Sequence, residues 1–91
     1  MAEVVRARAA EAFEAEGCST PREWANGPGD RYAPHEHPSH KVLFCLEGSI
    51  VFHVEGRDVE LERGARLDLP PGTVHGATVG PAGCRCVEAS R

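Results

Sequence analysis

The chain has 91 residues, of which 41% are hydrophobic and 26% charged, and this size and composition fit one small globular domain with a thin core. Ten basic and fourteen acidic residues give a net charge of -4, which argues against a protein that follows nucleic-acid phosphates. No apolar run is long enough to span a membrane. The charged N-terminus also lacks the apolar segment of a signal peptide, so we expect a cytoplasmic protein whose four cysteines are reduced thiols.

The first segment has the pattern of an amphipathic helix. Residues 2–16 are rich in alanine and glutamate, and Gly17 follows as a plausible C-cap. The apolar positions at helical spacing are Val5, Ala9, Ala12 and Phe13. We therefore predict an N-terminal helix within residues 1–17 that provides a packing or dimer contact, followed by one β domain over residues 18–91.

From residue 20 onward, prolines and glycines separate short alternating segments, which is the pattern of many short strands. The expected strands are residues 22–25, 31–35, 41–46, 49–54, 58–61, 66–69, 74–79 and 84–88. The turn at residues 55–57 joins a hairpin with one apolar face, formed by Ile50, Phe52, Val54, Val59 and Leu61. So many short strands would leave exposed edges in an open sheet, so we predict a mainly β fold closed into a small barrel or jelly roll.

All five histidines lie in this β region, and three of them have informative positions. His35 and His37 are two residues apart, so on a strand both rings face the same side. Neutral imidazole nitrogens bind Zn, Cu, Fe and Ni, and such a pair can clamp one divalent ion. His75 begins a new strand after the tight Pro70–Pro71–Gly72 turn. The competing interpretation is a set of structural histidines bonded to backbone and water.

The spacing of these residues resembles the two signatures of the cupins, small single-domain members of the conserved-barrel type in particular. The first match runs Gly29, five residues, His35-Glu36-His37, three residues, Lys41, six residues, Gly48. The second runs Gly64, five residues, Pro70, one residue, Gly72, two residues, His75, three residues, Val79. The resemblance covers roughly residues 22–89 and implies a single antiparallel jelly-roll β-barrel with a metal site inside, held by His35, His37 and His75.

Two positions depart from the cupin pattern. Val79 stands where the second signature usually ends in Asn, and Lys41 stands where a carboxylate ligand is usual. An ammonium group cannot ligate a cation, so three interpretations of Lys41 stay open. In the first, the three histidines are the only ligands and Lys41 turns aside or is neutral. In the second, His40 replaces the missing ligand, which needs a bulge because it faces the opposite side. In the third, the barrel is metal-free and Lys41 binds an anion together with the histidines.

The leading hypothesis is therefore a cupin that holds one divalent transition metal (Zn, Fe, Mn or Ni) and acts on a small molecule, as a dioxygenase-like or isomerase-like enzyme. Lys41 and His40 are the catalytic candidates. The alternative is a metal-free module that binds or senses a small anionic ligand. We expect Cys45, Cys84 and Cys86 to fill the core, His53 to lie on the surface, and Trp24 and Tyr32 to serve mainly in packing. The thin core, and the habit of similar cupins, favour a homodimer.

Overall fold

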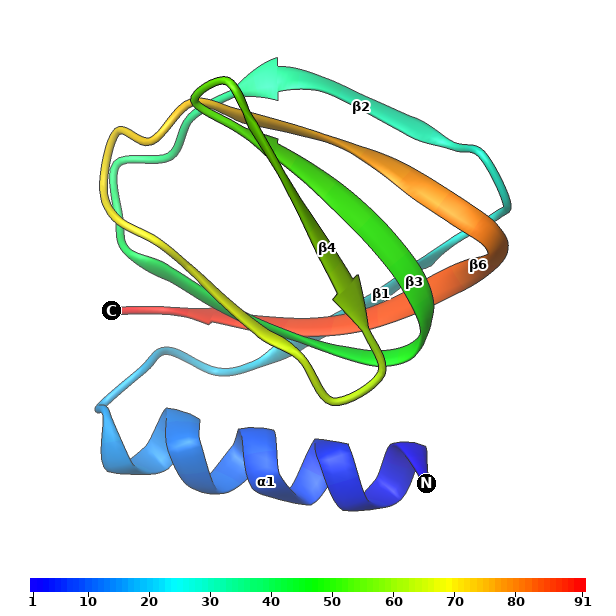
Figure 1. The fold of residues 1–91 in the computed structure, drawn as a ribbon. Coiled ribbons are helices and arrows are strands. Elements are labelled where there is room, and N and C mark those ends of the chain that lie inside the picture. The colour runs from blue at the N-terminus through cyan, green and yellow to red at the C-terminus, as the bar shows by residue number, and fades with distance from the viewer.

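Helix α1 spans Ala2–Ala15 and lies along the outside of the β structure, as the computed structural model shows (Figure 1). Its buried residues are Val5, Ala9 and Phe13, which belong to the predicted apolar face. The Phe13 ring packs edge-to-face on Phe44, with centroids 5.6 Å apart. The helix ends at Ala15 with Glu16 as its C-cap, and Gly17, the next residue, adopts the left-handed backbone (φ 69°) typical of a glycine that terminates a helix.

The β structure contains six strands rather than the eight segments expected from the sequence. They are β1 (Arg22–Asn26), β2 (Arg31–His35), β3 (Lys41–Val54), β4 (Arg57–Glu62), β5 (Arg66–Leu69) and β6 (His75–Ser90). The difference arises because β3 and β6 each join two expected strands. The chain bends within each of them instead of leaving the sheet, with register shifts between Cys45 and Glu47 and between Gly48 and Ile50.

The two long strands bend over and take part in both layers of the barrel (Figure 1). In the layer next to α1, the first half of β3 pairs with β5 and with the second half of β6, which in turn pairs with β1. In the other layer, the second half of β3 pairs with β4 and with the first half of β6, which pairs with β2. All pairings are antiparallel. The predicted jelly-roll architecture is confirmed.

Alternate residues of the strands supply two separate cores. The inner core fills the barrel and contains Leu43, Cys45, Ile50, Phe52, Leu61, Leu69, Ala77, Val79, Cys84 and Cys86. The outer core lies between the barrel and α1 and contains Val5, Ala9, Phe13, Val42, Phe44, Leu46, Val87 and Ala89. The three cysteines predicted to be core residues are buried free thiols. No helix has the length and hydrophobicity needed to cross a membrane.

Candidate metal centre

Strand pairing brings His35 and His75 together. The β2–β6 register places His35 directly opposite His75, although forty residues separate them in the chain. The rings lie side by side, with centroids 4.4 Å apart. His37 follows the end of β2, and its ring centroid lies 4.9 Å from that of His35 and 5.3 Å from that of His75. The structure thus gathers the three histidines that the sequence singles out.

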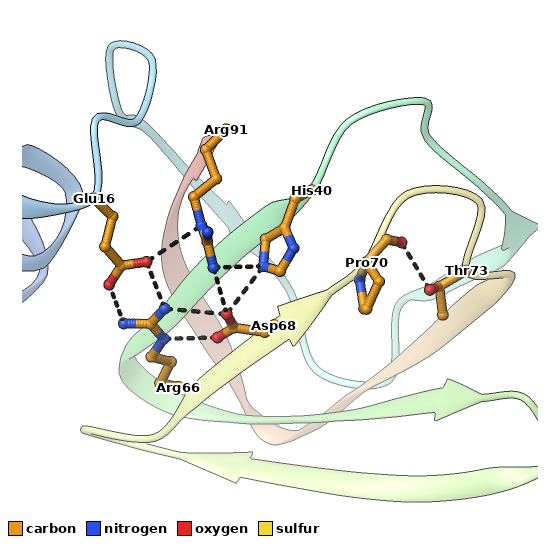
Figure 2. Close-up of polar contacts among 7 residues, drawn as sticks. All are labelled: Glu16, His40, Arg66, Asp68, Pro70, Thr73 and Arg91. Atoms are coloured by element: carbon orange, nitrogen blue, oxygen red, sulfur yellow. Dashed lines mark hydrogen bonds and ion pairs between the residues drawn. The ribbon is translucent and has the colours of Figure 1, made fainter.

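The turn that precedes β6 helps to hold two of these histidines in place. The Thr73 hydroxyl donates a hydrogen bond to the Pro70 carbonyl at 2.7 Å, which closes the turn (Figure 2). The Gly72 amide donates to the carbonyl of His37 at 2.9 Å. The Thr73 carbonyl lies 3.0 Å from Nδ1 of His75. One tight turn therefore positions both the backbone of His37 and the ring of His75.

Backbone contacts determine which ring nitrogens are free. Nδ1 of His35 lies 2.8 Å from the Ala33 carbonyl, and Nδ1 of His75 lies 3.0 Å from the Thr73 carbonyl. A carbonyl oxygen can only accept, so Nδ1 must carry the hydrogen in both rings, and Nε2 of a neutral ring then keeps its lone pair. This is the tautomer and the kind of hydrogen-bonded orientation that histidine metal ligands use.

The surroundings of the third ring, that of His37, favour its neutral form. Burial lowers the pKa of His37, and the positive charges of Lys41 and the neighbouring histidines lower it further. A neutral imidazole is the form that binds a metal ion, because the protonated ring has no free lone pair. The arrangement therefore offers three nitrogen donors without first removing a proton from His37 at neutral pH.

A cavity of about 210 Å³ opens beside the three histidines. Its apolar wall is formed by Trp24, Leu43, Phe52, Leu69 and Ala77. Tyr32 also lines it and packs edge-to-face on Trp24, with ring centroids 5.9 Å apart. The packing role expected for Trp24 and Tyr32 is thus only part of their function, because both also shape the cavity.

Lys41 lies in this cavity, and its ammonium is paired with a carboxylate that the sequence interpretation overlooked. Lys41 Nζ lies 3.3 Å from Oε2 of Glu88, while the indole nitrogen of Trp24 donates to Oε1 at 2.8 Å. Both charged side chains are about one-fifth exposed. Glu88 therefore compensates the positive charge that replaces the usual cupin carboxylate. The sequence contains a signal for this, because Glu88 shares the alternate positions of the strand with Cys84 and Cys86, which are expected to face inward.

His40 immediately precedes β3 and, unlike the three histidines of the site, does not line the cavity. Its Nε2 lies 3.0 Å from Asp68, within the cluster of charged side chains drawn in Figure 2. No local bulge turns it toward the cavity, so the structure does not bring this candidate to the site. His53 lies on the surface as expected, 2.7 Å from Asp58 and 2.9 Å from Thr78.

Comparison with known proteins agrees with this architecture. Residues 23–88 match the family model described as Cupin domain. The chain belongs to the cupin family. A solved structure with the same fold is an RmlC-like cupin from Shewanella frigidimarina, with a TM-score of 0.71 at 24% identity over 78% of this chain and 63% of that one.

Two curated relatives match about half of this chain. Quercetin 2,3-dioxygenase of Bacillus subtilis is 38% identical over 53 residues, which is 56% of this chain and 16% of that protein. The tetracenomycin polyketide synthase protein TcmJ of Streptomyces glaucescens is 43% identical over 49 residues, 53% of this chain and 33% of that protein. The chain thus corresponds to only a small part of each relative.

The three histidines of this cupin fit a divalent transition metal. Their ligating nitrogens all lie within 4.8 Å of one another. Bonds of about 2.0–2.1 Å to one ion separate two nitrogen ligands by roughly 3–4 Å, so the rings need to draw together only slightly. Three neutral imidazoles suit Zn, Fe or Ni and leave further coordination positions open.

Proposed function

We propose that this cupin binds one divalent transition metal, Zn, Fe, Mn or Ni, through His35, His37 and His75, and acts on a small molecule held in the adjacent cavity. The observation that carries the proposal is the convergence of three imidazoles, two of them oriented by backbone carbonyls, on the wall of a cavity. A scattered or fully hydrogen-bonded set of rings would have supported a structural role instead.

Each part of the site has a role in this function. When bound, the ion would supply Lewis acidity and open coordination positions for substrate. The apolar wall would hold the body of the substrate and exclude water, and the Glu88 carboxylate would offset the charge of the Lys41 ammonium. We favour dioxygenase-like or isomerase-like chemistry; the likeness to quercetin 2,3-dioxygenase supports the first of these classes.

Metal analysis of protein purified without an affinity tag or chelator tests the proposal. We expect close to one metal ion per chain after reconstitution with Fe, Mn, Ni or Zn, and a loss of at least about tenfold in affinity for His75→Ala. His53→Ala is the matched control, because it removes a surface imidazole that does not line the cavity and should leave metal content unchanged. A wild-type protein that retains none of the four ions would support the metal-free alternative.

We also infer that the protein forms a homodimer. The proposal is supported by the small core and by β2, which is exposed at all five positions and pairs with a strand on one side only. Sedimentation velocity at micromolar concentration should then give twice the mass of the 9.8 kDa chain. A single species of monomer mass would contradict it.

A further inference from the structure

Arg22 stands at the cavity on the same face of β1 as Trp24. Side chains alternate along a strand, and Trp24 both lines the cavity and packs against the inner core. Glu23, between them, points the other way and pairs with Arg6 of helix α1. The inner face of β1 therefore carries a guanidinium followed by an indole, and both side chains line the cavity.

The Arg22 guanidinium has no partner in the protein. Glu88 is its direct neighbour in the β1–β6 register, but the two Glu88 oxygens are engaged by Lys41 and Trp24. Arg22 forms no ion pair and no side-chain hydrogen bond, whereas the other cation of the cavity, Lys41, is paired. The charge left available to a ligand is therefore that of Arg22, which offers the planar fork of donors that matches a carboxylate.

The rest of the cavity sets the size and shape of the ligand. The cavity of about 210 Å³ suits a small molecule such as a single substituted ring. Trp24, Phe52 and Leu43 line it with apolar surface suited to a flat body. The three histidines complete the lining.

We propose that the substrate is a small planar carboxylate, with its carboxylate bound by Arg22 and its ring packed against Trp24 and the apolar wall. The proposal rests on the proposed function, since it names the substrate class of the same site. Arg22 acts in recognition, and the part of the substrate remote from the carboxylate would be turned toward the histidines. Lys41 and Glu88, which neutralise one another, contribute no net charge to this selection.

Binding of benzoate, read from the fluorescence of Trp24, tests this inference. Trp24 is the single tryptophan of the chain and lines the cavity, so its emission reports occupancy directly. We expect benzoate to bind wild-type protein at least about tenfold more tightly than Arg22→Gln, because a hydrogen-bonded ionic contact is lost. Benzamide, a neutral molecule of the same shape, should bind both proteins equally weakly. Arg57→Gln, which removes a positive charge at the β3–β4 hairpin, should behave as wild type.

The measurement is made on both chelator-treated and metal-reconstituted protein, so that it separates the two proposals. A preference for benzoate that depends on Arg22 in the chelator-treated protein supports the recognition role even if no metal binds. Equal affinity for benzoate and benzamide, or equal affinity of Arg22→Gln and Arg57→Gln for benzoate, would overturn it even if the three histidines bind a metal. Circular dichroism of each variant confirms that the barrel is folded, which we expect because Arg22 is exposed and bonds to no other side chain.

Discussion

Lys41 and Glu88 differ in how far the sequence alone identifies their place at the site. The departure at Lys41 is visible in the sequence because the flanking spacing identifies the position at which a cupin usually carries a carboxylate. Its partner could not be identified in the same way. Glu88 meets Lys41 only through the β3–β6 pairing, and local patterns do not determine the register between strands so far apart. The same holds for Arg22, whose place at the cavity depends on β1 pairing with the last strand.

Because Glu88 offsets the Lys41 charge, Glu88→Gln should weaken metal binding by about tenfold. Glutamine keeps one carbonyl oxygen that can accept a hydrogen bond from Trp24 or Lys41, but it carries no charge, so the ammonium then repels a dication without compensation. Lys41→Met should have the opposite effect, since it leaves an uncompensated carboxylate. The double variant should return toward wild-type affinity. Competition with a chromophoric chelator measures all three.

Glu60→Gln is the control for this charge series, because Glu60 is exposed on β4 and does not line the cavity. It should bind metal as the wild type does. The idea that Glu88 neutralises Lys41 fails if Glu88→Gln and Glu60→Gln have the same affinity, or if the double variant is no better than Glu88→Gln.

At the scale of the elements, the sequence indicates where the chain changes direction but not whether a strand ends there. The hairpin at residues 55–57 forms as predicted, with Ile50 opposite Leu61 and Phe52 opposite Val59. The expected strands stop at residue 46 and resume at residue 49, yet β3 continues through Gly48. The reason is tertiary: at Gly48 the bend of β3 lies directly against the bend of β6 at Gly83, and hydrogen bonding between the strands resumes on either side.

This close approach makes Gly48 far less replaceable than a left-handed glycine with open space around it, such as Gly56. A Cβ at position 48 would lie 1.9 Å from the carbonyl oxygen of Gly83, in addition to the cost of a φ of 69°. We expect Gly48→Ala to reduce the free energy of unfolding by about 3 kcal/mol or more. Gly56→Ala, with φ 82° but no atom within 4 Å of its Cβ, should cost about 1 kcal/mol. Urea unfolding monitored by circular dichroism compares the two, and equal losses would show that the contact with Gly83 is unimportant.

At the scale of the whole molecule, the two signatures were sufficient to predict the barrel and the convergence of the three histidines, because their spacing encodes one strand-turn-strand arrangement. The ion pairs that connect the helix to the barrel could not be predicted in the same detail. Arg66 of β5 binds both Glu16, at the end of α1, and Asp68, while Arg91 at the C-terminus reaches Glu16 and Asp68 as well (Figure 2). These residues come from separate parts of the chain and meet only in the folded state.

Asp68 makes this charged cluster sensitive to acid. The hydrogen bonds from Arg66, with a further contribution from His40, lower the pKa of Asp68 to about 2. A carboxyl group whose pKa is lower in the folded than in the unfolded chain stabilises the fold above its unfolded pKa of about 3.9, and this stabilisation is lost as the pH falls toward 2. Asp68→Asn should therefore lower the free energy of unfolding at pH 7 by about 1 kcal/mol, a modest value because water screens a side chain that is one-third exposed.

The difference in free energy of unfolding between wild type and Asp68→Asn should keep its full size from pH 7 down to about pH 5. It should shrink between about pH 4 and pH 2, where the wild-type carboxylate becomes protonated. Urea unfolding midpoints at pH 7, 4 and 2.5 measure this. Asp58→Asn, which removes a carboxylate from β4 on the far side of the barrel from α1, controls for the change in net charge. If the difference between wild type and Asp68→Asn is the same at all three pH values, then Asp68 contributes through shape or neutral hydrogen bonding, and its charge does not hold the helix, β5 and the C-terminus together.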